Sequence, residues 1–230
     1  LLFASLKSDS IIMLDEMKKN NKYAQFYISD VSGSSKAGWN YDKGREVKWT
    51  PWNDANTHVG NGTMSPDKKR FYFTKCQLMN DTMKMHCEIY VSEFKDGKWS
   101  DPARLDDIIN MAGSTNTQPA VAMTKQGEVF YWVSDRPNGE GGLDIWFATR
   151  DKSGKFMNPQ NAGRKINTEG DETTPFYDSK TGTLYFSSNG MIGMGGSDIF
   201  RTKGSQKRWE NPINMGYPIN SSVDDMYFVM

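Results

Sequence analysis

The chain has 230 residues, enough for one large all-β domain, and its 28 basic and 28 acidic side chains give a formal net charge of zero. No basic block is interleaved with aromatic residues, so nucleic acid is not expected as a partner. The longest apolar runs have the length of single strands, so no membrane insertion is expected either. Aromatic residues make up 13% of the chain, which contains 21 glycines and lacks sustained helical periodicity. This composition is typical of short strands joined by tight turns.

The chain begins inside a degenerate copy of a repeat. Residues 1–5 (LLFAS) and 25–29 (QFYIS) have the pattern of the second and third strands of later copies, and a charged insertion separates them. Because the first residue is Leu1 and not an initiator methionine, we expect the sequence to be a piece of a larger protein. We therefore draw no conclusion about its compartment from the missing targeting segment.

Four kinds of marker then recur with one period. The strings FYFTK, FYWVS and LYFSS begin at Phe71, Phe130 and Leu184, which gives steps of 59 and 54 residues. The strings EIY, DIW and DIF follow each of them, and then an aromatic residue three positions before a proline. Each copy closes on an Ile-Asn pair; these pairs are Ile109-Asn110, Ile166-Asn167 and Ile219-Asn220. Period-spaced copies with several short strands each are the signature of a β-propeller.

We therefore predict an all-β fold, a β-propeller of four-stranded antiparallel blades, with about four blades in this chain and more in the parent protein. The chain is interpreted as a single domain. It would contain a partial blade, three full blades and the first strand of a further or ring-closing blade, over residues 1–53, 54–111, 112–167, 168–220 and 221–230.

Two features fix the expected order of strands in a blade. Pro119 and Pro175 fall in the first strand of their copies, which fits an edge strand beside the channel, where a proline removes no ladder bond. Apolar residues of each second strand are expected to pack between blades. They are Phe71, Phe73, Phe130, Trp132, Leu184 and Phe186.

The two cysteines, Cys76 and Cys87, flank a loop between neighbouring strands of a hairpin, where a disulfide is geometrically plausible. A disulfide would favour an oxidising compartment. Two reduced thiols facing each other are the alternative. Metal binding by these cysteines with His86 is disfavoured because no fourth ligand is in view.

Several strings resemble a known family. SPDKKRFYFTKC, VSDRPNGEGGLDIWFAT and LYFSSNGMIGMGGSDIF resemble the WD-repeat-like, TolB-type propeller repeat. WENPINMGYPINSSVDD resembles, more narrowly, the propellers of OmpA-family outer-membrane-associated proteins of Bacteroidetes, some of which belong to type IX secretion. The resemblance extends from about Asn56 to the end of the chain and implies a periplasmic, outer-membrane-associated protein. Peptidoglycan binding would belong to domains absent from this chain.

No catalytic constellation is evident. His58 and His86 are the only histidines, and neither a nucleophile elbow nor a zinc-protease motif occurs. A polar ring is expected at one channel mouth, at equivalent places before or within the innermost strands: Asn56, Asn116, Glu172 and Asp225. Glycoside hydrolysis needs two carboxylates about 5–10 Å apart. The plainer interpretation is that these side chains cap turn amides.

Glycine-rich loops join the second and third strands at residues 137–142 and 190–196. We expect the glycines to supply positive φ and the following Asp144 and Asp198 to fix the hairpin through backbone bonds, with calcium binding as a weaker alternative. The second loop also carries apolar residues on its tip, where flexible methionines suit contact with a partner protein. The expected partner-binding residues are Met191, Ile192 and Met194.

We predict from these observations a non-catalytic scaffold without cofactors, which binds other cell-envelope proteins in the periplasm. The alternative is a carbohydrate-binding or glycan-hydrolysing propeller that uses the channel-mouth carboxylates Glu172 and Asp225. A third hypothesis is the propeller domain of a peptidase.

Overall fold

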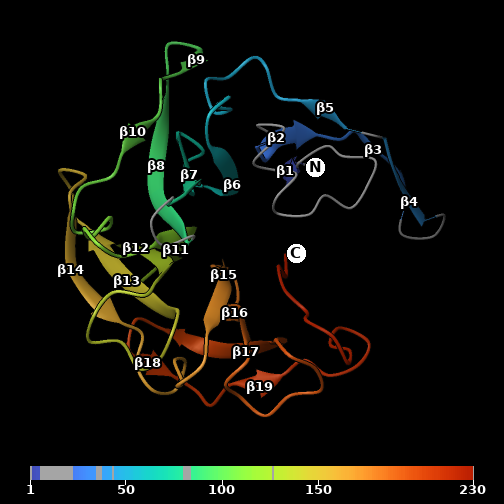
Figure 1. The fold of residues 1–230 in the computed structure, drawn as a ribbon, viewed down its shortest axis with the longest axis vertical. Helices are drawn as coiled ribbons and strands as arrows, with labels where there is room; N and C mark the ends of the chain where they lie inside the picture. Colours follow the sequence, from blue (N-terminus) through green and yellow to red (C-terminus); the bar gives the residue numbers. More distant parts are fainter. Residues whose placement is uncertain are drawn as a thin grey trace.

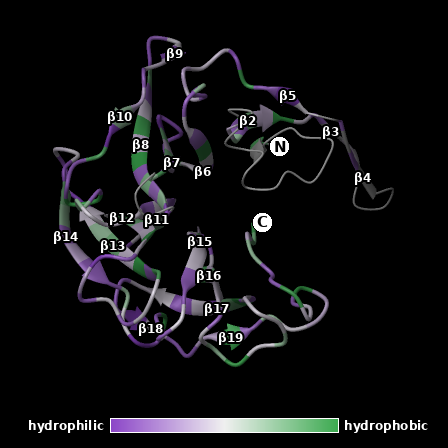
Figure 2. Cartoon of the chain, viewed as in Figure 1, coloured by the Kyte–Doolittle hydropathy of each residue, from purple (hydrophilic) through white to green (hydrophobic). Residues whose placement is uncertain are grey.

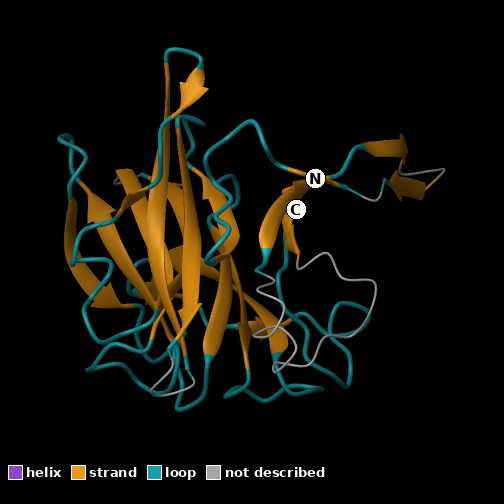
Figure 3. Cartoon of the chain, turned by 45° about the horizontal axis from the view of Figure 1, so that its top comes forward, coloured by secondary structure: helices purple, strands orange, loops and turns teal. Residues whose placement is uncertain are grey.

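The computed structural model describes residues 2–5, 23–34, 38–42, 44–79, 84–125 and 127–229. All regular structure in these residues is β-strand, and no helix occurs among them (Figure 3). Most of the charged insertion after the first strand, and the end residues Leu1 and Met230, lie outside the described residues.

Among the described residues, four antiparallel sheets of three or more strands follow one another along the chain. The first contains β1 (Leu2–Ser5), β2 (Gln25–Ile28) and β5 (Arg45–Glu46). The second contains β6 (His58–Met64), β7 (Arg70–Leu78), β8 (Met85–Lys95), β9 (Lys98–Trp99) and β10 (Ala103–Arg104). The third contains β11 (Asn116–Thr124), β12 (Gly127–Ser134), β13 (Asp144–Arg150) and β14 (Phe156–Asn161). The fourth contains β15 (Glu172–Asp178), β16 (Thr183–Ser188), β17 (Asp198–Ser205), β18 (Arg208–Trp209) and β19 (Ile213–Asn214).

These sheets are arranged as the blades of a propeller. In Figure 1 they follow one another in an arc, and β6, β11 and β15 lie nearest the centre. Each of these three strands is the first of its sheet and forms its edge, and β11 contacts both β6 and β15. A separate two-stranded hairpin, β3 (Val31–Ser34) and β4 (Gly38–Tyr41), projects from the first blade. The predicted β-propeller of four-stranded antiparallel blades is confirmed.

The apolar core is divided into clusters that lie between consecutive blades. Along β8, for example, hydrophobic and hydrophilic residues alternate (Figure 2). Each cluster is built on alternate residues of one blade's second strand, which pack against the preceding blade. These residues are the predicted Phe71 and Phe73 of β7, Phe130 and Trp132 of β12, and Leu184 and Phe186 of β16, and each is at most 1% exposed. Blade-to-blade packing therefore supplies most of the hydrophobic stabilisation, since one blade alone has no enclosed core.

One asparagine closes each blade by binding both backbone groups of a single residue in the third strand, and it is buried in the second, third and fourth blades. In the second blade, Asn110 Oδ1 accepts a hydrogen bond from Ile89 N at 2.8 Å, and Asn110 Nδ2 donates to Ile89 O at 2.8 Å. The same pair of bonds joins Asn167 to Ile145, Asn220 to Ile199 and Asn53 to Phe26. We call Asn53, Asn110, Asn167 and Asn220 the asparagine clamps.

Three of the asparagine clamps belong to the Ile-Asn markers, so the period in the sequence has a structural cause. The isoleucines of the first two markers, Ile109 and Ile166, are fully buried, and Ile219 of the third is partly buried. The clamp of the first blade, Asn53, follows Trp52 in place of an isoleucine, and the sequence pattern did not reveal it.

The prediction of a strand near the end of the chain is wrong. Among the described residues, 221–229 contain no strand and pair with none of the first blade. The segment instead continues from the fourth blade, where Asp225 N donates to Ser197 O at 2.7 Å and the ring of Phe228 stacks on Tyr185. An apolar run becomes a strand only where a neighbour completes its hydrogen-bond ladder.

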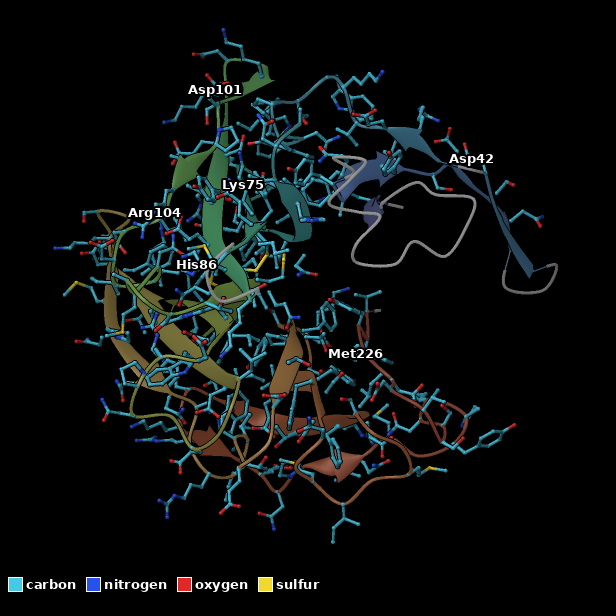
Figure 4. The ribbon with its side chains drawn as sticks, in the orientation of Figure 1. Asp42, Lys75, His86, Asp101, Arg104 and Met226 are labelled. Carbon is cyan, nitrogen blue, oxygen red and sulfur yellow. A yellow bond between two sulfur atoms is a disulfide. The ribbon has the colours of Figure 1, made fainter. Side chains whose placement is uncertain are left out.

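The predicted disulfide is confirmed. Cys76 and Cys87 are directly opposite each other on β7 and β8 and are joined by a disulfide, with their Cα atoms 4.1 Å apart. Because both sulfurs are bonded to each other, neither can form a metal site with His86, which is labelled in Figure 4.

We expect Asn167→Asp to lower the free energy of unfolding by about 2–3 kcal/mol, because Asp cannot donate to Ile145 O or to Asn161 Oδ1 and places a buried carboxylate beside these two oxygens. Urea denaturation measures this change. Asn211→Asp, at an exposed position of the fourth blade, is the control and should shift stability by less than about 0.5 kcal/mol. Equal effects at the two positions would show that the clamps do not stabilise the blades.

Reduction of the Cys76–Cys87 disulfide should lower the free energy of unfolding by at most about 3 kcal/mol, because it closes a short loop. Denaturation with and without dithiothreitol measures this loss. The Cys76→Ser/Cys87→Ser variant should have the stability of the reduced protein and should not respond to reductant.

Candidate functional site in the central channel

A pocket of about 260 Å³ lies where the innermost strands meet. It is lined by the middle of β6, β11 and β15 and by residues 227–229. Its polar lining residues are Asn61, Thr63, Gln118 and Thr174. Its aromatic lining residues are Phe176, Tyr177, Tyr227 and Phe228. We call this space the channel pocket.

The backbone around the channel pocket is unusual at repeated positions. A β-bulge interrupts each innermost strand, and the bulged residues Asn61, Gln118 and Thr174 have φ of 52°, 52° and 51°. Tyr227, in the segment after the fourth blade, has φ of 65°. Such values are rare outside glycine, and most of all for a β-branched threonine. Strained backbone of this kind concentrates at functional sites, which makes the channel pocket a candidate.

A relay of hydrogen bonds from blade to blade holds these left-handed residues. Gln118 N donates to Thr74 Oγ1 at 3.1 Å, and Thr174 N donates to Gln118 Oε1 at 2.6 Å. Tyr227 N in turn donates to Thr174 Oγ1 at 3.4 Å. Each side chain of one blade thus satisfies an amide that the bulge removes from the next blade's ladder. We call this series the channel relay.

The channel relay leaves polar groups free to bind a ligand. Gln118 uses its carbonyl oxygen in the relay, and among the described residues its Nε2 group has no hydrogen-bond partner. The side chain of Asn61 likewise forms no hydrogen bond within the described part of the chain. The sequence analysis missed these residues. The signal that could have found them is their shared place directly before Gly62, Pro119 or Pro175 in the innermost strands.

Two of the residues predicted at the channel mouth begin innermost strands and are fully buried. Asn116 is the first residue of β11 and lies opposite Ser134 on β12, and Glu172 is the first residue of β15 and lies opposite Ser188 on β16. Asp225 follows the same pattern in the next segment, since its amide bonds to the preceding blade as that of Glu172 does.

Asn56, the fourth predicted member, lies elsewhere. It is an exposed turn residue whose N–H donates to Asp54 Oδ1 at 2.9 Å. The equivalent position in the second blade is taken by Val59, which lies opposite Lys75 and whose N–H donates to Ala24 O of the first blade at 2.9 Å. This three-residue shift arises because the turn formed by Asp54 delays the start of β6.

Glu172 caps the loop before its strand. Its carboxylate accepts hydrogen bonds from Thr168 N at 2.7 Å, from Thr168 Oγ1 at 2.6 Å and from Ser188 Oγ at 2.6 Å. Burial is the main cause that raises the pKa of Glu172, and these hydrogen bonds oppose it. Asp225 caps its loop in the same way through Ser221. Neither residue lines the channel pocket.

The buried aspartates of the glycine-rich loops have the expected role. Asp144 accepts hydrogen bonds from Glu140 N and from Asn161 Nδ2, and Asp198 does so from Met194 N and Asn214 Nδ2. Burial raises the pKa of Asp144 above its ordinary value.

The glycines of these loops serve a different purpose from the expected one. None of the described glycines in 137–142 or 190–196 has positive φ. A Cβ at Gly141 would instead lie 2.3 Å from Thr168 O, and one at Gly195 would lie 2.1 Å from Val223 O. Glycine is therefore required by the close approach of the next blade's loop.

The expected partner-binding tip is partly exposed. Ile192 is 97% exposed and Met194 is 53% exposed, whereas Met191 packs against the cluster between the third and fourth blades. The structure thus separates Met191 from the other two.

Groups that would suggest other chemistry are missing from the described residues. No cluster of three or more His, Cys, Asp or Glu side chains there could hold a metal ion. A helix long and apolar enough to cross a membrane does not occur there either.

Comparison with known proteins supports the fold and not the expected family. No protein-family model matches the chain, and no curated protein matches it. Among solved structures, a thermostable family-43 glycoside hydrolase matches with a TM-score of 0.50 and 15% identity, over 86% of this chain and 66% of the other. An α-L-arabinofuranosidase from Lactobacillus brevis matches with a TM-score of 0.48 and 9% identity, over 82% of this chain and 63% of the other. A puromycin-hydrolysing peptidase from Mycobacterium tuberculosis matches with a TM-score of 0.45 and 16% identity, over 85% of this chain and 31% of the other. The chain spans less than two thirds of the length of each.

These findings contradict the expected identity. No family model supports a TolB-type or OmpA-family protein or a type IX secretion component, and the structure that matches with a TM-score of 0.50 is a glycoside hydrolase. The prediction of a non-catalytic envelope scaffold, and with it the prediction that the protein is not an enzyme, is therefore wrong. The strings that carried the resemblance are those of a propeller blade, which hydrolases also use.

We expect Glu172→Gln to fold and to gain stability relative to the wild type as pH rises. The hydroxyls of Thr168 and Ser188 can rotate to accept from the new amide, while the other oxygen still accepts from Thr168 N. A raised folded-state pKa means that the native protein binds more protons than the unfolded chain between the ordinary value, about 4.3, and the folded value. The contribution of Glu172 to the free energy of unfolding of the wild type therefore falls as pH rises from the ordinary pKa to the folded-state pKa.

Urea denaturation of both proteins from about pH 4 to about pH 8 measures this difference. Glu169→Gln, at an exposed neighbouring position, is the control and should show no such trend. Glu172→Ala should lose about 1–3 kcal/mol at every pH, because it leaves the amide of Thr168 unpaired. A difference between wild type and Glu172→Gln that stays constant with pH would contradict a buried carboxylate with a raised pKa.

Proposed function

We propose that this propeller acts on carbohydrate and binds a saccharide in the channel pocket. The observation that carries the proposal is the combination of free side-chain amides and aromatic rings around one space at the propeller centre. A saccharide presents hydroxyl groups, which both donate and accept hydrogen bonds, and patches of C–H groups, which pack on aromatic faces. The channel pocket supplies both kinds of contact, from Asn61 and Gln118 on one side and from Phe176 and Tyr227 on the other.

The size of the channel pocket favours a short ligand. Its volume of about 260 Å³ is just below the range of roughly 300–1,000 Å³ that is usual for drug-sized ligands. One or two sugar units suit this space better than a longer oligosaccharide would. The match with a family-43 glycoside hydrolase supports a carbohydrate ligand by analogy of fold.

If the protein is an enzyme, the reaction that we propose is glycoside hydrolysis. This reaction needs a general acid, for which a carboxyl group with a raised pKa is suited. Glu172 has that property, because burial raises its pKa. It is fully buried and lies outside the channel pocket, so this form of the proposal requires the loop at Thr168 to open before Glu172 meets a saccharide. A second carboxylate about 5–10 Å away would be required, and Asp225 at the equivalent position is the candidate. A panel of chromogenic glycosides tests this form: wild-type cleavage that Glu172→Gln loses would support it, and cleavage unchanged in that variant would exclude Glu172 as the acid.

We further propose an oxidising compartment, the periplasm or the cell exterior, as the place of action. The Cys76–Cys87 disulfide supports it, because disulfides of this kind persist outside the reducing cytosol.

Gln118→Glu should weaken binding of a neutral mono- or disaccharide about twofold to twelvefold, because it removes the free Nε2 donor and keeps the oxygen that accepts from Thr174 N. A glycan array selects the saccharide, and isothermal titration calorimetry measures the affinity. Gln77→Glu, at an exposed position on β7 outside the channel pocket, is the control and should bind as the wild type does. Equal losses in the two variants, or no saccharide bound by the wild type, would overturn the proposal.

A further inference from the structure

A second hollow, of about 440 Å³, lies away from the channel on the β17–β18 hairpin of the fourth blade. Four cationic side chains line it: Lys165, Lys203, Lys207 and Arg208. Glu210 is the one carboxylate among the described residues that line it. We call this space the basic hollow. Since the whole chain carries 28 basic and 28 acidic residues, four cations against one acid is a local concentration of charge.

The cations of the basic hollow are not neutralised by neighbouring carboxylates. None of the four takes part in an ion pair within the described residues. Other exposed or half-exposed cations of the chain do form such pairs, as Arg104 does with Glu88 at 2.8 Å. Four unpaired positive charges around one hollow attract anions, and their fields add.

The scaffold beneath the basic hollow is fixed by bonds between two blades. Lys165 follows β14 of the third blade, and its Nζ donates to Trp209 O of the fourth blade at 2.8 Å. Gln206 N donates to the hydroxyl of Tyr131 on the third blade at 2.9 Å, and Trp209 Nε1 donates to Gln206 O at 2.7 Å. The hairpin that carries Lys203, Lys207 and Arg208 is therefore held at a set position relative to Lys165.

We propose that the basic hollow binds the acidic groups of an anionic polysaccharide, one that carries carboxylates or sulfates. Lysine ammonium groups dominate the hollow, and as point charges they accept such groups in many orientations. Nucleic acid is disfavoured, because binding of single strands relies on exposed aromatic platforms and Trp209, the aromatic residue of the hollow, is only 4% exposed. The choice of a polysaccharide rests on the proposed function, since the same protein would bind a saccharide in the channel pocket.

Affinity electrophoresis through gels with polygalacturonate, dextran sulfate or uncharged dextran tests the proposal. We expect the folded wild-type protein to be retarded by the two anionic polymers and not by dextran, with retardation lost at about 1 M salt, where the screening length falls to about 3 Å. The triple variant Lys203→Gln/Lys207→Gln/Arg208→Gln should bind the anionic polymers about fivefold to thirtyfold more weakly.

A matched triple variant on the first two blades, Lys48→Gln/Lys68→Gln/Lys98→Gln, removes three exposed charges far along the chain from the hollow. We expect it to bind the anionic polymers as the wild type does. Equal weakening in both triple variants would overturn the proposal, because binding would then follow net charge. Tighter binding of a single-stranded oligonucleotide than of either anionic polymer would overturn it as well.

The outcomes for the two sites are separable. Gln118→Glu should retain full binding to the anionic polymers, because the channel pocket does not take part. If the wild type binds anionic polymers through the basic hollow but no neutral saccharide, the channel proposal fails and the basic hollow stands. If neutral saccharide binds and the hollow variant retains its polymer binding, the basic hollow alone is excluded.

Discussion

Every blade shares one backbone constraint on which the structure depends: the fourth strand pairs with only part of the outer edge of the third strand. The fourth strand has two residues in β10 and β19 and six in β14, and in these three blades the N–H of one residue at the start of the third strand bonds to an asparagine side chain instead of a strand. The asparagine clamps fill that gap. A single amide side chain both donates and accepts, so it replaces one residue of a missing strand and blocks the sheet edge against other pairings. With the third strand held in this way, each blade presents a regular surface on which the next one packs.

Much of the fold was visible in the sequence because the chain repeats itself. The period, the strand order and the interblade residues such as Phe130 and Leu184 follow from comparing copies, and the structure agrees with them. The errors arise where a copy departs from the others. Asn56 was matched to Asn116 by residue type, whereas the turn at Asp54 shifts the strand so that Val59 takes that place. The segment 221–229 has the pattern of a strand, but a pattern does not supply the partner that a ladder requires.

The site was less visible than the fold, and the mistaken family has the same origin. The motif WENPINMGYPINSSVDD carried the narrower resemblance, yet its residues are occupied in closing the fourth blade. Trp209 is in the core, Asn214 holds Asp198, and Asn220 is a clamp. Such a motif reports the fold and carries no information about a ligand. The channel residues, by contrast, have different types in each copy. Asn61, Gln118 and Thr174 share only their left-handed backbone, which a search by residue type does not find.

The channel relay connects the channel pocket to the contacts between blades. Its hydrogen bonds all run in one direction: each amide of a later blade binds a side chain of the earlier one, from Thr74 through Gln118 and Thr174 to Tyr227. Gln118 bonds to both neighbouring blades, through Thr74 and Thr174, and it also lines the channel pocket. A ligand bound to the Nε2 group of Gln118 would therefore contact the same side chain that joins the third blade to the fourth.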